Sequence, residues 1–89
     1  MNAFVSVLGM DKEGIIKEVS SVLATHSINI LDLNQTIVKG YFTMVMFVDL
    51  TDLVIELKEL KKQLELSANE LNLKIKVQHE DIFSSMHNI

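Results

Sequence analysis

The sequence contains no cysteine, no proline, no tryptophan and no arginine. Without cysteine the chain has no disulfide framework and no thiolate for a zinc site or a nucleophile. That composition fits a reducing compartment, so we expect a cytoplasmic protein. All eight positive charges are lysines, and the formal net charge is −4. An acidic chain without arginine, the usual residue for bidentate contacts with phosphate and guanine, is a poor candidate for binding nucleic acid.

Long apolar runs are also missing from the 89 residues. None approaches the roughly 20 residues of a membrane helix. Residues 1–8 are too short for a signal-peptide core and lack its basic lead, so we expect no membrane partner. The length fits one domain, which we place over residues 1–89. A domain this small hides only about 60–65% of the surface that its unfolded chain exposes, so dimerisation would add stability.

The first quarter of the chain predicts a strand followed by a helix. Residues 3–8 alternate, with Ala3, Val5 and Val7 on one side, which is the period of a strand. Gly9 ends this strand, and Asp11 is a plausible N-cap. The following apolar positions recur at helical spacing: Ile15, Val19, Val22, Leu23 and His26. This spacing predicts a helix over residues 11–26, closed by His26.

The next segment predicts a hairpin. Residues 28–38 are rich in β-branched side chains and predict a strand, although Ile30 and Leu33 can share one face only if the strand contains a bulge. Residues 39–40 form a short turn to a third strand over residues 41–50, which is nearly all apolar. Such a strand should be covered on both faces.

The last third of the chain predicts a helix, a strand and a short helical tail. Asp52 opens the long helix, and Asn72 helps to end it. Its apolar stripe consists of Leu53, Leu57, Leu60, Leu64, Ala68 and Leu71. Residues 73–78 alternate between apolar and polar side chains, which predicts a fourth strand with one wet face. Residues 80–89 carry Ile82, Phe83, Met86 and Ile89 at helical spacing and predict a short C-terminal helix.

This order of elements predicts an α+β fold, the ferredoxin-like βαββαβ sandwich. It has a four-stranded antiparallel sheet with two helices on one face. The opposite face contains Phe4, Leu8 and half of the strand over residues 41–50, so it needs a cover. We expect a partner subunit to supply that cover.

Residues 9–14, Gly-Met-Asp-Lys-Glu-Gly, form the first candidate site. They lead from a strand to a helix N-terminus, where unsatisfied N–H groups and the helix dipole attract an anion such as a carboxylate. Gly14 has no side chain, so a ligand can approach the backbone closely. The alternative is a plain tight turn capped by Asp11, and the bare motif favours it. The third glycine of a dinucleotide fingerprint and the ending of a P-loop are both absent.

Other polar positions carry weaker signals. Asn29, beside Ile30, can donate and accept hydrogen bonds, which suits a zwitterion, but taken alone it is far better explained as an ordinary turn residue. The three histidines lack metal-ligand spacing, so we predict no metal site. The acids Asp49 and Asp52 suggest magnesium less than they suggest a helix cap by Asp52 or Thr51. No serine stands in a nucleophile elbow, so the chain is not expected to be an enzyme.

Residues 7–16 resemble the opening of ACT domains, in which a strand ends in a Gly-x-Asp-x-x-Gly-Ile/Val turn. Asn29-Ile30 matches the Asn-Ile pair at the start of the second strand of that family. The resemblance extends through Gln35-Thr36 and residues 41–44 to the tail over residues 82–89, so it covers essentially the whole chain. The pattern is similar to that of a family of small stand-alone ACT-domain proteins of uncharacterised function.

The resemblance implies a homodimer, often formed side by side through the second strand, that binds a small ligand such as an amino acid at the interface. The implied ligand-binding residues are Met10, Asp11, Gly14, Asn29 and Ile30. No enzyme domain is visible in the sequence, so regulation would act on a separate protein, such as a regulated enzyme.

We therefore expect a small-molecule-binding regulatory domain that senses an amino acid or related metabolite and needs no cofactor. The alternative is a ligand-free interaction subunit that regulates a separate enzyme.

Overall fold

The computed structural model describes residues 1–80. The elements follow the chain as β1 (Asn2–Gly9), α1 (Lys12–Thr25), β2 (Asn29–Val38), β3 (Tyr41–Asp49), α2 (Leu57–Leu71) and β4 (Lys74–His79). This is the predicted βαββαβ order, so the ferredoxin-like α+β fold is confirmed. The C-terminal helix expected over residues 80–89 lies, from residue 81 onward, outside the described residues.

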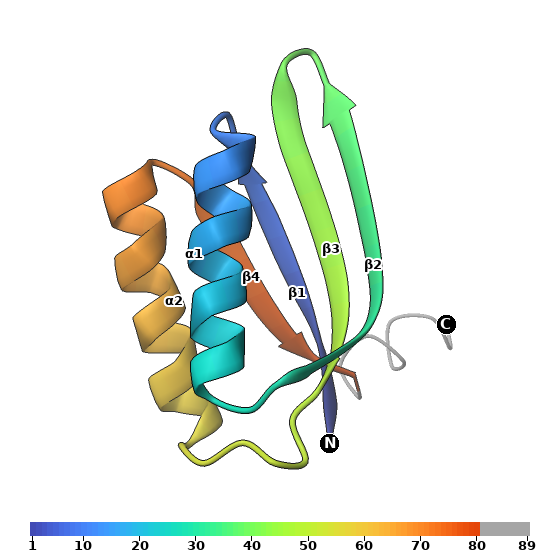
Figure 1. The fold of residues 1–89 in the computed structure, drawn as a ribbon, viewed down its shortest axis with the longest axis vertical. Coiled ribbons are helices and arrows are strands. Elements are labelled where there is room, and N and C mark those ends of the chain that lie inside the picture. Colours follow the sequence, from blue (N-terminus) through green and yellow to red (C-terminus); the bar gives the residue numbers. More distant parts are fainter. Residues whose placement is uncertain (81–89) are drawn as a thin grey trace.

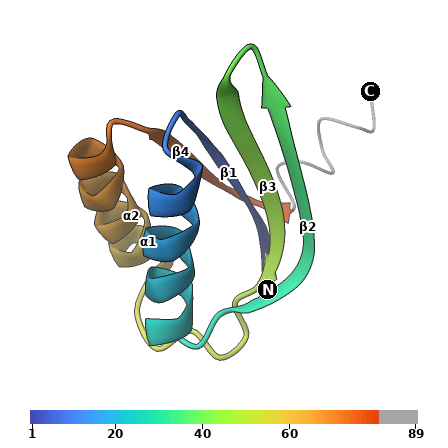
Figure 2. The same ribbon diagram turned by 45° about the horizontal axis from the view of Figure 1, so that its top comes forward.

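The four strands form one antiparallel sheet in the order β2-β3-β1-β4. Both helices lie on the same side of this sheet, as Figures 1 and 2 show. β1 and β3 are central, while β2 and β4 form the two edges. The hairpin of β2 and β3 therefore lies on one side of β1, and β4 lies on the other.

The core lies between the helices and one face of the sheet. In β1 every second residue is buried, as the alternation predicts, and in β3 the same alternation places four large side chains inward. The buried residues of the central strands are Ala3, Val5, Val7, Phe42, Met44, Met46 and Val48; those of the helices are Ile15, Val19, Leu23, Leu60, Leu64 and Ala68. Each large side chain buried in this way contributes about 1.5–3 kcal/mol, so this layer holds the fold together.

The hairpin between β2 and β3 has the predicted turn and the predicted irregularity. Lys39 and Gly40 have φ angles of 51° and 83°, the pair of positive values that a type I′ turn requires. The register of the two strands shifts between Ile30 and Asp32, which confirms the expected bulge.

α1 ends at His26, and this residue also joins the two helices. His26 is the C-cap, and its Nε2 lies 2.7 Å from Oε1 of Gln63 on α2. A second polar contact connects the helices, since the Ser67 hydroxyl donates a 3.0 Å hydrogen bond to the Glu18 carboxylate. The predicted role of His26 in closing α1 is therefore confirmed, and α1 and α2 are held side by side by polar contacts as well as by the core.

α2 begins five residues later than predicted. We placed its start at Asp52, with Thr51 or Asp52 as N-cap, but the helix starts at Leu57 and Glu56 precedes it without a side-chain cap. The Asp49 carboxylate instead accepts hydrogen bonds from the Thr51 hydroxyl and the Thr51 N–H, at 2.5 and 2.9 Å. These bonds hold Thr51 in a turn and lower the pKa of Asp49.

Two further features explain the late start of α2. The N–H of Leu53 donates to the carbonyl of Leu50, whose side chain is buried, so this segment anchors the end of β3. The β-branched Val54 and Ile55 then follow, and such residues lose side-chain freedom in a helix. Leu53 therefore packs on the core from a loop rather than from the first turn of α2.

Gly9 provides a direct test of how closely β1, α1 and the start of β4 pack. A Cβ atom at Gly9 would lie 2.8 Å from Cδ1 of Ile15 and 2.8 Å from Cβ of Leu73. Replacing Gly9 with alanine should therefore lower the free energy of unfolding by about 1–3 kcal/mol, because the tightly packed neighbours must shift. Urea unfolding followed by circular dichroism measures this change.

Gly40→Asn is the matched control for Gly9→Ala. Nothing lies within 4 Å of a Cβ at Gly40, and asparagine tolerates the positive φ of that turn. This variant should unfold within about 0.5 kcal/mol of the original protein. Equal stability of Gly9→Ala and the original chain would show that β1, α1 and β4 are packed more loosely than described.

Candidate functional site

The turn between β1 and α1 is a helix N-terminus closed by Asp11. Oδ1 of the Asp11 side chain accepts the N–H of Gly14 at 3.0 Å, and the Asp11 carbonyl accepts the N–H of Ile15 at 2.9 Å. Asp11 is therefore the N-cap, as predicted. Because a helix leaves its first N–H groups without intrahelical partners, those of Lys12 and Glu13 remain for an anion.

Gly14 has a different role from the one that the sequence indicated. We expected its missing side chain to leave space for a ligand. A Cβ there would instead collide with Oδ2 of Asp11 and lie 2.9 Å from Asp11 Cγ. The capping carboxylate of the same chain therefore occupies that space. Glycine at this position permits the cap, and a ligand would have to approach the N-terminus of α1 from the side of Lys12 and Glu13.

Two further side chains shape this turn. Met10 is 70% exposed and presents an apolar surface at the tip. The Lys12 ammonium lies 5.8 Å from the centre of the Phe42 ring, a cation–π contact that ties the turn to the start of β3. Sequence analysis did not single out Lys12, because the pairing depends on β3 lying beside β1. The turn thus combines a helix N-terminus, an apolar tip, the positive charge of Lys12 and the negative charges of Asp11 and Glu13.

Asn29 and Ile30 lie at the opposite end of the sheet from this turn. In the sheet register, Asn29 of β2 pairs with Asp49 of β3, and Asp49 pairs with Asn2 at the start of β1. At the other end of β1, Gly9 pairs with Phe42 of β3, which in turn pairs with Ile37 of β2. The two ends of β1 are seven residue steps apart, or about 23 Å along the strand.

One chain therefore does not assemble the five predicted residues into a single site. Met10, Asp11 and Gly14 belong to the turn between β1 and α1 and to the first turn of α1, which lie in the upper part of Figure 1. Asn29 and Ile30 lie near the bottom, where the chain leaves α1 and enters β2. Both groups are at the surface, apart from the partly buried Gly14, but a small metabolite cannot contact both within one chain.

The edge strand β2 is the most exposed element of the described structure. All ten of its residues are exposed, and its ladder connects only to β3. Ile30, Leu33 and Ile37 are 46%, 44% and 62% exposed, although they share the sheet face of the buried Val48, Met46 and Phe42. The helices cover β1 and β3 but leave these side chains of β2 uncovered. Apolar side chains gathered on a free edge indicate an interaction surface.

The second face of β3 is also uncovered within this part of the chain. Tyr41 and Val45 are 49% and 38% exposed there, while Phe4 and Phe47 pack against each other with ring centres 4.8 Å apart. A hollow of about 110 Å³ lies beside this aromatic pair. The prediction that β3 is covered on both faces therefore holds for one face within residues 1–80, and nothing in this part of the chain covers the other.

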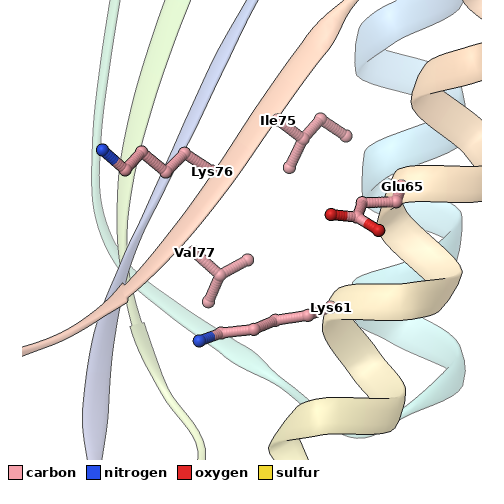
Figure 3. Close-up of a pocket in the computed structure, with 5 residues that line it drawn as sticks. All are labelled: Lys61, Glu65, Ile75, Lys76 and Val77. Carbon is pink, nitrogen blue, oxygen red and sulfur yellow. The ribbon is translucent and has the colours of Figure 1, made fainter.

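Two larger hollows lie between α2 and β4, away from the predicted site. One, of about 160 Å³, is lined by Lys61, Glu65, Ile75, Lys76 and Val77 (Figure 3). The other, of about 360 Å³, is lined by Glu65, Ala68, Asn69, Leu73, Lys74 and Ile75. The sequence analysis predicted no catalytic residues in this region. The one feature of the sequence that could have pointed to these hollows is the alternation of lysine with apolar residues in β4.

Two searches bear on other classes of site. In residues 1–80, no three histidine, aspartate or glutamate side chains gather closely enough to hold a metal ion. Over the same residues, neither α1 nor α2 combines the length and the apolar composition of a membrane span.

Comparisons with known proteins place the chain in a family. A family model described as ACT domain matches residues 3–78. The UPF0237 protein of Methanococcus maripaludis is 47% identical over 88 residues, covering 99% of this chain and 98% of that protein. The UPF0237 protein of Clostridium perfringens is 46% identical over 89 residues, covering all of both chains.

Solved structures agree with the sequence relatives. An ACT domain protein from Streptococcus pneumoniae is 37% identical with a TM-score of 0.81, covering 93% of each chain. A formyltetrahydrofolate deformylase from Pseudomonas syringae has a TM-score of 0.77 at 22% identity, over 88% of this chain and 27% of the deformylase, and so shows the shared fold alone. With a family model over most of its length and a close structural match, the chain belongs to the ACT domain family, a family of regulatory rather than catalytic domains.

Proposed function

We propose that this ACT domain senses an amino acid or a related metabolite at the interface of a homodimer, and that it regulates a separate protein. The observation that carries the proposal is the free edge of β2, which is ten residues long and exposed throughout. Natural proteins protect such edges with lysine or proline. β2 contains neither, and its only charged residue is Asp32.

Pairing of two β2 strands is the simplest way to cover this edge. An antiparallel pair related by a two-fold axis joins two four-stranded sheets into one and satisfies the backbone groups of both edges. It also brings Ile30, Leu33 and Ile37 of each copy against the other subunit. A domain of this size gains stability from burying these side chains.

The same pairing would assemble the divided site. A two-fold axis reverses one subunit relative to the other, so Asn29 of the partner subunit comes to the end of the sheet where Met10 and Asp11 lie. The separation then becomes about three strand spacings, or ~14 Å across the sheet, instead of about 23 Å along it. A metabolite together with side chains from both subunits can bridge that span. The site is therefore incomplete without the second copy.

The chemistry of the two halves suits a zwitterion. The free N–H groups at the start of α1 would bind a carboxylate, which the helix dipole favours. Asn29 of the partner subunit or the second carboxylate oxygen of Asp11 would accept hydrogen bonds from an ammonium group. Binding of both charges needs no cofactor and leads to no covalent step, which agrees with a sensing function.

We expect the protein to be a dimer at micromolar concentration, and Leu33→Lys to make it monomeric. Leu33 lies near the middle of β2, so in an antiparallel pair its lysine replacements from the two copies approach each other and repel. Sedimentation equilibrium measures the change from dimer to the 10.1 kDa monomer.

Leu66→Lys is the matched control for this dimer experiment. Leu66 is 60% exposed on α2, far from β2, and the substitution makes the same chemical change. This control should remain dimeric. A monomeric original chain, or an unchanged dimer in Leu33→Lys, would contradict the proposed pairing.

Ligand binding should raise the melting temperature, and Asn29→Ala should remove that effect. At ~100 times its dissociation constant, a ligand that binds only the folded state adds about 2.7 kcal/mol to stability. A thermal-shift screen over the twenty amino acids identifies the ligand. We prefer Asn29→Ala to a change at Gly14, because a side chain at Gly14 would displace the Asp11 cap and disturb the fold itself.

The control for the ligand experiment is Asn69→Ala, which removes an exposed asparagine from α2. It should keep the full thermal shift, and the monomeric Leu33→Lys variant should lose it, since the site needs both subunits. A shift that persists in Asn29→Ala would place the ligand elsewhere. The absence of a shift with any amino acid or related metabolite would favour the ligand-free interaction subunit instead.

A further inference from the structure

The opposite edge of the sheet carries a groove between α2 and β4. The two hollows described above adjoin at Glu65 and Ile75, which line both, and together we call them the β4 groove. Its α2 wall consists of Lys61, Glu65 and Ala68, whose spacing of four and three places them on one face of the helix. Its other wall is β4 itself, the strand that ends the sheet on this side.

Among residues 1–80, β4 pairs only with β1, so its outer edge can receive another strand. An edge strand presents a row of N–H and C=O groups that an extended peptide can pair with. Figure 3 shows Ile75 and Val77 directed from β4 toward the α2 side, and the Glu65 and Lys61 side chains directed from α2 toward β4. A peptide added to β4 would lie beside the strand in the plane of the sheet, with one face turned to the α2 side.

The side chains of β4 alternate strictly between two kinds. Ile75 and Val77 are partly buried on the helix side, where they pack against the core. Lys74 and Lys76 are exposed on the other side, level with Leu8 and Ser6 of β1, and Figure 3 shows Lys76 directed away from α2. Because successive residues of a strand face opposite sides of a sheet, a strand added here meets an apolar side and a positive side in turn.

The strand β4 carries a charge opposite to that of the chain. Lys74 and Lys76 project from its outer face, and Lys61 and Glu65 contribute one charge of each sign on the α2 side, whereas the formal net charge of the chain is −4. The lysines disfavour a second copy at this edge, because antiparallel pairing of two β4 strands would bring like charges together. β2 contains no lysine, and Asp32 is its single charged residue, so this barrier is smaller there. The two edges therefore suit different partners.

We propose that the β4 groove binds an extended segment of another protein, in which acidic residues alternate with apolar ones. The segment adds a fifth strand next to β4. Its apolar side chains lie over Ile75 and Val77 beside α2, and its acidic side chains lie next to Lys74 and Lys76. This site is separate from β2 and from the ligand, and it gives the domain a surface through which it can contact the protein that it regulates.

The test uses a fluorescently labelled synthetic peptide, about as long as β4, that alternates glutamate with valine. Fluorescence anisotropy should show saturable binding to the full chain that weakens as salt is added. A peptide that alternates lysine with valine should not bind. The double variant Lys74→Glu/Lys76→Glu should weaken binding of the acidic peptide by about tenfold or more, because two attractions become repulsions.

The matched control is Lys58→Glu/Lys62→Glu. These lysines are exposed on α2 and do not line the groove, so the control changes the net charge equally while leaving the site intact. It should bind the acidic peptide as the original chain does. In two-dimensional amide NMR spectra, the peptide should shift signals of β4 and the groove face of α2 rather than those of β2.

Three results would overturn the proposal. They are the absence of binding of the acidic peptide to the original chain, an equal loss of binding in both double variants, and amide shifts confined to β2. A fourth result would also overturn it, namely self-association of Lys74→Glu/Lys76→Glu without loss of peptide affinity. That result would mean that the lysines prevent β4 from pairing with a second copy and do not contribute to peptide binding. Because Leu33→Lys leaves β4 unchanged, peptide binding by that monomeric variant tests this proposal separately from the dimer and its ligand.

Discussion

The length of α1 is the constraint on which the rest of this structure depends. The 14 residues of the helix span about 21 Å, close to the length of β1, on which α1 packs through Ile15, Val19 and Leu23. α1 therefore returns the chain to the level where β1 began. β2 must start there, at the opposite end of the sheet from the turn between β1 and α1. The division of the predicted site into two halves follows directly from this return.

The path of the chain along α1 also determines which parts of the sheet the helices cover. α1 and α2 lie over β1, β3 and the inner face of β4, and polar contacts between His26 and Gln63 and between Ser67 and Glu18 keep them together. β2 extends beyond this cover, so its apolar residues are exposed although they share the face of the core. The fold thus produces a free edge suited to self-association without any special motif.

The two edges of the sheet differ in chemistry in a way that separates their partners. β2 is long, nearly uncharged and apolar on one side, whereas β4 is short and carries lysines on its outer face. A second copy meets one acidic residue, Asp32, at β2 and two lysines at β4. The two edges of the sheet therefore present chemically different surfaces.

Much of the fold could be predicted because it depends on local patterns. The alternation in β1, the bulge in β2, the turn at Lys39 and the end of α2 at Asn72 each follow from residues that are close in sequence. The start of α2 could not be predicted in this way, because Thr51 and Asp52 are good helix caps when considered in isolation. The Asp49 carboxylate accepts hydrogen bonds from Thr51 and holds it in a turn only because β3 fixes the position of Asp49.

The sequence by itself determined the elements, their order, the two faces of β1 and the cap at Asp11, because periodicity and capping act over a few residues. Only the tertiary structure decided that Asp11 fills the space above Gly14, that Lys12 lies over Phe42, and that Asn29 lies at the far end of the sheet. It also decided that β2 and β4 are the edges. These relations join residues far apart in the chain, and the pairing of strands and the packing of helices set them, which no local pattern encodes.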